Sequence, residues 1–141
     1  MDKVVLDSSV TASWFLPDEE TPESDALYLA ARKNEIKLFV PALWWWECGN
    51  IIRTNVMRGR LDEEAMNLAL ECLYQLSAQV ESAPSNATHQ KILSLALVHQ
   101  LSFYDAAYLE LALTRQALLA TNDKALRRAA SAEGVRCLAF G

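Results

Sequence analysis

A short apolar strand that ends on an acid sets the main constraint on this sequence. The segment Lys3–Ser9 reads KVVLDSS, so an unbroken run of Val and Leu meets Asp7 and then two hydroxyl residues. Apolar residues without alternation are typical of a strand buried on both faces, as in a parallel sheet. Open α/β sheets bind their ligands at the carboxyl ends of the strands. Asp7 is therefore predicted to lie at the edge of the sheet where a site would form.

Strand and helix patterns alternate along the rest of the chain. Further strands are predicted at residues 37–40, 80–83, 118–120 and 135–138, and helices at 10–15, 22–34, 42–57, 63–79, 86–100, 102–112 and 124–133. This alternation predicts an α/β fold, a three-layer sandwich whose mainly parallel central sheet of about four to five strands is flanked by helices. No linker, repeat or low-complexity segment interrupts the pattern, so residues 1–141 are predicted to form one domain.

Two of the predicted helices carry apolar residues whose placement matters. Trp44, Trp45 and Trp46 are consecutive in the helix at 42–57, so they cannot share one face, and at least one is expected at an edge or an interface. Base stacking is a further use if a ring is exposed beside a site. In the helix at 63–79, Leu68, Cys72 and Leu76 are predicted to point inward.

Composition excludes several classes of protein. The net charge of −5 argues against nucleic-acid binding through a broadly basic surface, although it leaves a nucleic-acid enzyme open. The three cysteines and two histidines lack the spacing of a zinc site, and reduced thiols in the cytoplasm are expected. No apolar run approaches the length of about 20 residues that a membrane span needs, so no membrane association is predicted.

Four acids from distant parts of the chain are predicted to converge. Asp7 and Asp123 follow short strands, while Asp105 and Glu47 lie near the starts of helices that leave from the same edge. Two carboxylates about 4 Å apart repel by roughly 4 kcal/mol at an effective dielectric of 20, so such a group needs cations or protons. Oxygen ligands alone suit Mg²⁺ or Mn²⁺, and these ions serve the hydrolysis of phosphodiesters.

Each acid also has a purely structural interpretation. Asp7 and Asp123 could cap the helices that follow them, and Ser102 with Asp105 fits a capping box. Glu47 could pair with Arg53. Taken singly, a cap is the commoner role for such an acid, but four acids at one edge would then be a coincidence.

The acids lie in motifs that resemble those of the PIN-domain nucleases, and most closely the VapC toxins of bacterial toxin–antitoxin pairs. The motifs occur in the order VVLDSS at residues 4–9, Pro41 with ECGN at 47–50, YDAAYL at 104–109 and TND at 121–123. Together they span nearly the whole chain. The Trp triplet departs from the smaller or aliphatic residues usual in the family.

The resemblance implies a PIN-like fold and an endoribonuclease that depends on Mg²⁺ or Mn²⁺, with Asp7, Glu47, Asp105 and Asp123 as metal-binding and catalytic acids. It implies that Ser9 helps to hold the acids or the water on the metal, and that Asn122 helps to place Asp123. A VapB-like antitoxin, an RNA substrate and a homodimer are the implied partners.

Two other functions stay open at this point. One is a non-catalytic protein-interaction domain, and the other an aspartate-based phosphatase, which the Ser at position 9 disfavours because an Asp is usual there. Candidate RNA contacts are Arg53, Arg58, Arg60 and Lys124.

Overall fold

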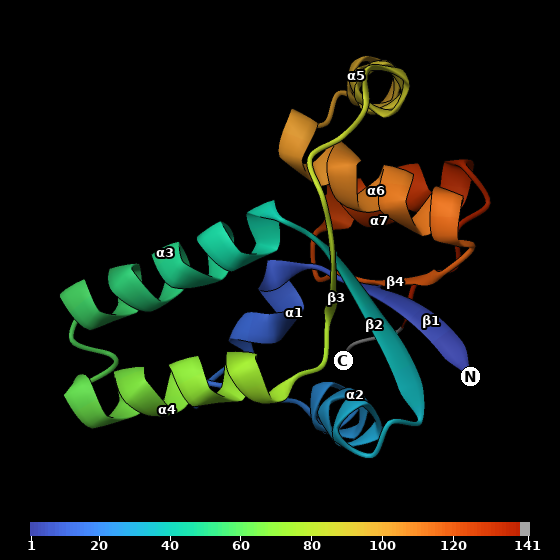
Figure 1. Ribbon diagram of the computed structural model, residues 1–141. Coiled ribbons are helices and arrows are strands. Elements are labelled where there is room, and N and C mark those ends of the chain that lie inside the picture. Colours follow the sequence, from blue (N-terminus) through green and yellow to red (C-terminus); the bar gives the residue numbers. More distant parts are fainter. Residues whose placement is uncertain (139–141) are drawn as a thin grey trace.

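A four-stranded parallel sheet forms the centre of the computed structural model, which describes residues 1–138 (Figure 1). The strands are β1 (Asp2–Leu6), β2 (Ile36–Pro41), β3 (Gln79–Glu81) and β4 (Leu118–Ala120). Their spatial order is β3-β2-β1-β4, which places β1 in the interior of the sheet. All pairings are parallel, with Val4 opposite Leu38 on β2 and Leu118 on β4.

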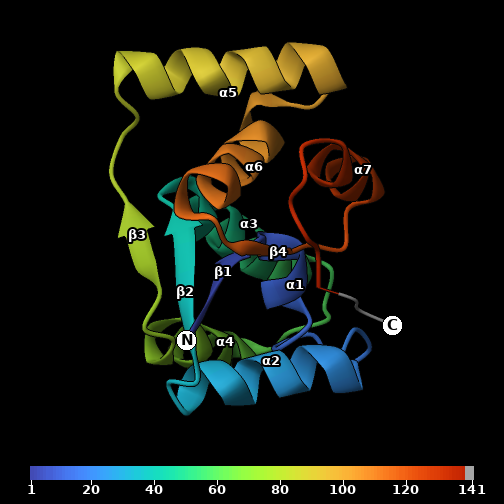
Figure 2. The ribbon, with the colours of Figure 1, turned by 90° about the vertical axis from the view of Figure 1, so that its right-hand side faces the viewer.

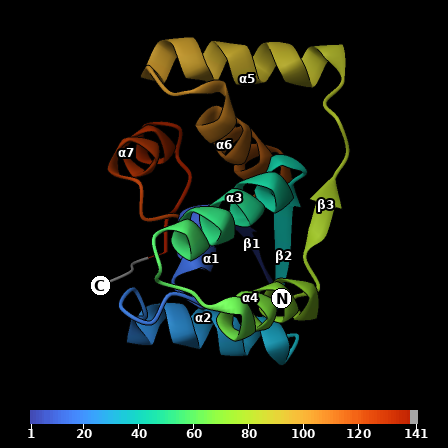
Figure 3. The ribbon, with the colours of Figure 1, turned by 90° about the vertical axis from the view of Figure 1, so that its left-hand side faces the viewer.

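Seven helices are found among these residues: α1 (Ser8–Ala12), α2 (Pro22–Arg32), α3 (Leu43–Met57), α4 (Glu63–Gln75), α5 (Asn86–His99), α6 (Phe103–Arg115) and α7 (Lys124–Ala132). They cover both faces of the sheet. Figure 2 views the face with α6 and α7 in front, and α5 lies outside α6. Figure 3 views the opposite face, where α3 and α4 lie in front. The predicted three-layer α/β sandwich is thus confirmed.

The strand β1 is the centre of the core because its side chains are enclosed on both faces. Val4, Val5 and Leu6 are all buried, as expected of an unbroken apolar run in a parallel sheet. Several helices begin at a residue whose side chain caps them. Thr21 forms a capping box with Ser24 at the start of α2, and the side chains of other caps accept hydrogen bonds at α4, α5 and α6.

The three tryptophans at the start of α3 have three different environments. Trp44 is fully buried, and its Nε1 donates a hydrogen bond to Thr11 Oγ1 at 2.9 Å. The Trp45 ring lies beside the Tyr74 ring of α4, with centroids 4.9 Å apart. Trp46 is 78% exposed. The expectation that one of the three cannot be buried is therefore confirmed.

Several predicted boundaries are wrong, and one predicted face is correct only in part. Leu76, just after α4, is buried as predicted and Cys72 is half-buried, but Leu68 is exposed. Ala69 and Leu73 are buried instead, because apolar residues occur all round this helix and packing against α3 selects the face. Residues 13–15 form a turn, so α1 ends at Ala12, and α4 ends at Gln75 instead of continuing to residue 79. The third strand occupies residues 79–81 where 80–83 was predicted.

The predicted last strand at residues 135–138 is reduced to a single bridge. Leu119 of β4 pairs with Cys137, and Leu138 N donates a hydrogen bond to Leu119 O at 3.0 Å. Because β4 itself has three residues, it offers little backbone for a longer ladder.

The neighbours Trp44 and Trp46 provide a test of this packing. Trp44→Ala should lower the free energy of unfolding by about 3–5 kcal/mol, because it empties a filled core position. The matched change Trp46→Ala should cost less than about 0.5 kcal/mol, because that ring is exposed. Urea unfolding of both variants measures the difference, and equal losses would contradict the assignment of the two rings.

Candidate active site

Asp7 lies directly after β1 and is buried, with 5% of its surface exposed. Its backbone N donates to Ala120 O at 2.9 Å, which ties the end of β1 to the end of β4. The Oδ2 atom accepts hydrogen bonds from Thr121 Oγ1 at 2.6 Å and Ser9 Oγ at 3.0 Å. Asp7 precedes α1, but its side chain makes no capping hydrogen bond. The carboxylate therefore faces the sheet edge and is oriented by hydroxyl groups.

Glu47 approaches the same place from the second turn of α3. Its Oε1 accepts a hydrogen bond from Tyr108 of α6 at 2.6 Å and one from Ser8 at 3.4 Å. The alternative pairing with Arg53 is not formed. Burial raises the pKa of Glu47 above its usual range, and the charges of Asp7 and Asp105 raise it further, against the lowering effect of the hydrogen bond from Tyr108.

Asp105 lies in the first turn of α6, behind the cap residue Ser102. Ser102 Oγ accepts the hydrogen bond of Asp105 N at 3.1 Å. Burial raises the pKa of Asp105, and the negative charges of Asp123 and Asp7 raise it further. The pKa of Asp105 is thus raised by acids that follow both β1 and β4.

Asp123 has the structural role that the sequence offered for it, and it lies beside the other acids. Its Oδ1 accepts a hydrogen bond from Leu126 N at 2.8 Å, so it does cap α7, as the structural interpretation predicts. Its own backbone N donates to Thr121 Oγ1 at 3.0 Å. Because Thr121 also donates to Asp7, one hydroxyl positions both acids.

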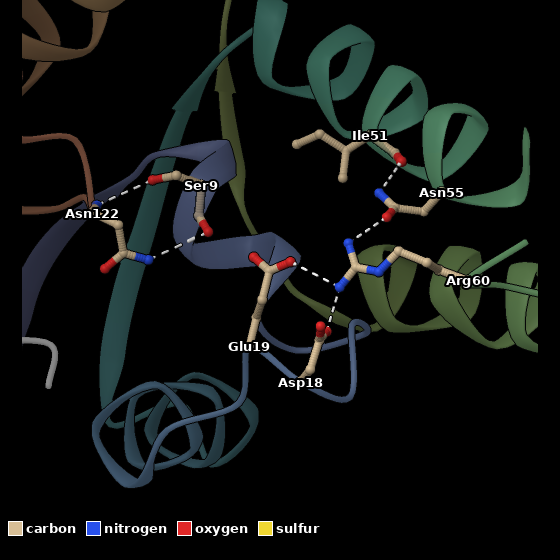
Figure 4. Close-up of polar contacts among 7 residues, drawn as sticks. All are labelled: Ser9, Asp18, Glu19, Ile51, Asn55, Arg60 and Asn122. Carbon is tan, nitrogen blue, oxygen red and sulfur yellow. Dashed lines mark hydrogen bonds and ion pairs between the residues drawn. The ribbon is translucent and has the colours of Figure 1, made fainter. Parts of the chain in front are cut away.

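Ser9 links the acids to the loop after β4. While its hydroxyl donates to Asp7, it accepts a hydrogen bond from Asn122 N at 3.1 Å. The side-chain Nδ2 of Asn122 donates to Ser9 O at 3.5 Å (Figure 4). These contacts hold the residue before Asp123 against the start of α1, in agreement with the predicted placing role of Asn122.

Three residues of this cluster were given no role by the sequence: Ser8, Tyr108 and Thr121. Each lies inside a motif that drew attention for its acid. Tyr108 follows Asp105 by three residues, which puts the two side chains on one face of α6. Thr121 directly follows β4, as Asp7 follows β1. The short spacing of Ser8, Tyr108 and Thr121 from the acids was the feature of the sequence that could have identified them as members of the site.

A ready-made metal cluster is absent from the described part of the chain. Within residues 1–138, no three side chains of the types Asp, Glu, His and Cys lie close enough together to hold an ion. The acids nevertheless lie near one another, because the charges of Asp7 and Asp105 raise the pKa of Glu47, and those of Asp123 and Asp7 raise the pKa of Asp105. The four acids thus come from separate segments to the same edge of the sheet, where they lie farther apart in this structure than the ligands of one ion.

Comparison with known proteins places the chain in a family. The PIN domain family matches residues 4–132, and the chain belongs to this family. A curated relative, Ribonuclease VapC3 of Pyrobaculum aerophilum, is 27% identical over 124 residues, which are 88% of this chain and 92% of the relative.

Solved structures agree on the fold. VapBC2 from Rickettsia felis, bound to a DNA fragment from its promoter, superposes with a TM-score of 0.67 at 14% identity, covering 99% of each chain. A toxin–antitoxin complex from Klebsiella pneumoniae superposes with a TM-score of 0.55 at 15% identity, covering 85% of this chain and 86% of that one.

The raised pKa of Glu47 predicts a dependence of stability on pH. The pKa of Glu47 is higher in the folded than in the unfolded protein, so protonated Glu47 favours the folded state. This contribution to the free energy of unfolding is fully present at low pH and is lost as the pH rises through the folded pKa. In EDTA, Glu47→Gln should therefore melt at a higher temperature than the wild type near pH 7, and this gap should shrink toward pH 4.

Glu71→Gln on the exposed surface of α4 is the matched control and should melt like the wild type at each pH. A wild-type protein that melts above Glu47→Gln at neutral pH in EDTA would contradict the assignment.

Proposed function

We propose that this PIN-domain protein is a VapC-type toxin, an endoribonuclease that depends on Mg²⁺ or Mn²⁺ and hydrolyses phosphodiester bonds in RNA. The observation that carries the proposal is the meeting of Asp7, Glu47, Asp105 and Asp123 at one edge of the sheet, from four separate segments. A curated relative that covers most of the chain bears the name ribonuclease, which supports the same activity.

The donor set suits a hard divalent cation. All four side chains offer carboxylate oxygens, and neither Cys nor His lies in the group, which favours Mg²⁺ or Mn²⁺ over Zn²⁺. The pKa values of Glu47 and Asp105 are raised by neighbouring negative charge, which is the repulsion that a cation would relieve. A bound ion would supply positive charge beside the phosphate and acidify a water molecule.

The acidic side chains would have two roles, which are binding the cation and accepting a proton. Asp7 is fixed by the hydroxyls of Ser9 and Thr121, so its oxygens keep one orientation toward a cation. The raised pKa values of Glu47 and Asp105 are those of the metal-free site, and a bound cation would lower them again. Whichever of the two does not bind the cation would take the proton that an attacking water loses.

The same hydroxyl contacts disfavour an aspartate-based phosphatase. Hydrogen bonds from Thr121 and Ser9 occupy Asp7 Oδ2, and Ser8 donates to Oδ1 at 3.4 Å. A carboxylate so bonded is a weaker nucleophile, and position 9 offers a hydroxyl where the phosphatases usually have an acid.

A VapB-like antitoxin is the partner that this proposal requires, and a toxin–antitoxin complex is among the solved structures with this fold. Within residues 1–138, no helix has both the length and the apolar character needed to cross a membrane. A homodimer and a cytoplasmic location stay predictions from the family resemblance.

The purified chain provides the direct test. It should cleave RNA in Mg²⁺ or Mn²⁺ and lose this activity in EDTA. Asp7→Asn should reduce the rate by at least about 10²-fold, because the charge that holds the cation is removed. Asp2→Asn, at the exposed opposite end of β1, is the matched control and should cleave like the wild type.

Asp105→Asn gives the test a second variant if Asp7→Asn fails to fold by circular dichroism. Cleavage that is the same in the wild type, in EDTA and in the folded variants at positions 7 and 105 would sink the proposal.

A further inference from the structure

A groove begins beside the acids and runs between α1 and α3. Its volume is about 390 Å³, and its lining includes Ser9 and Asn122 at one end and Arg58 and Arg60 at the other. Ser9 is the residue whose hydroxyl donates to Asp7, and Asn122 precedes Asp123. One end of the groove is therefore formed by residues adjacent to the acids of the proposed active site, while the acids themselves lie outside its lining.

A row of polar side chains follows the groove along α3. Glu47, Asn50, Thr54 and Arg58 are spaced by three, four and four residues, so they occupy one side of the helix. The last three line the groove. At 1.5 Å per residue, Arg58 lies about 16 Å along the helix from Glu47, which is room for a short stretch of an extended chain. The row of polar side chains thus extends from Glu47, one of the four acids, to the positively charged Arg58.

The two arginines at the far end differ in their contacts. The guanidinium of Arg60 is paired with Asp18 and Glu19, and its Nη1 donates to Asn55 Oδ1 at 2.6 Å (Figure 4). Within the described residues, no carboxylate lies within ion-pair distance of Arg58, which is exposed. Arg58 is the cation of the groove that is available to a ligand.

The pairing of Arg60 has an electrostatic consequence for the groove. Glu19 is one of the lining residues, and its charge would repel an anionic ligand. Arg60 offsets part of that charge, because it is shared between Glu19 and Asp18, and Asn55 is itself held by a hydrogen bond of 2.7 Å to Ile51 O. Among the charged residues that line the groove in the described part of the chain, Arg58 is the one outside an ion pair, so its positive charge is available to a phosphate.

We propose that this groove holds the sugar–phosphate backbone of the RNA strand next to the point of cleavage. Arg58 contacts a phosphate, Asn50 and Thr54 offer hydrogen bonds to the backbone, and Arg60 acts as a positioning residue that compensates Glu19. Arginine, asparagine and threonine are common phosphate contacts in nucleic-acid complexes. The inference rests on the nuclease activity proposed above and adds where the strand leaves the acids. It also removes Arg60 from the direct RNA contacts suggested by the sequence.

The test compares two arginines of one segment. Arg53 is exposed on α3 but does not line the groove, so, like Arg60, it is not a direct RNA contact in this proposal, although the sequence suggested it as one. Binding of a fluorescent, mixed-sequence single-stranded RNA is measured in EDTA, by anisotropy, over a series of salt concentrations. Arg58→Ala should weaken binding about five-fold at low salt. It should also reduce the slope of log K against log salt by about 0.7, since one phosphate contact is lost. Arg53→Ala should match the wild type in both.

The outcomes separate this inference from the proposed function. Suppose that the wild type cleaves RNA but Arg58→Ala keeps the wild-type affinity and salt slope, or that no RNA binding is detected in EDTA. Either result would refute the proposed role of the groove and leave the proposed nuclease activity intact. If the wild type neither binds nor cleaves RNA, both proposals fail. Equal losses in Arg58→Ala and Arg53→Ala would indicate a diffuse charge effect and would also overturn the groove.

Discussion

The buried carboxylate of Asp7 is the constraint on which the rest of the site depends. A carboxylate removed from water is costly unless hydrogen bonds or opposite charge compensate it. Here the compensation comes from hydroxyls, and the strongest contact, from Thr121, spans 114 residues of sequence. Since Thr121 also accepts the hydrogen bond of Asp123 N, the requirement to satisfy Asp7 fixes the loop that carries a second acid.

Glu47 and Asp105 are destabilised in their charged forms, and other contacts in the fold do not fully compensate this. Glu47 and Asp105 have raised pKa values because they are partly buried near further negative charges. The hydrogen bond from Tyr108 relieves this only in part for Glu47. Functional sites commonly retain such destabilising charge where a ligand compensates it. The proposed cation would relieve this repulsion between carboxylates.

The sequence predicted the parallel sheet because β1 is an unbroken apolar run, and it predicted the convergence of acids because their positions after strands and at helix starts follow from topology. It could not select the buried face of α4, since apolar residues such as Leu68 and Ala69 adjoin one another there. It also could not find the hydroxyl of Thr121 or the ion pairs of Arg60, because both connect segments that come together only in the folded chain.

The proposed function depends on the four acids at this edge of the sheet forming one divalent-cation site. Calorimetric titration of the metal-free protein with Mn²⁺, for the wild type and for Asp7→Asn and Asp105→Asn, measures this directly. We expect saturable binding to the wild type that each substitution weakens strongly, because the acids act as one site. Absence of binding to the wild type, or unchanged binding to both folded variants, would contradict it.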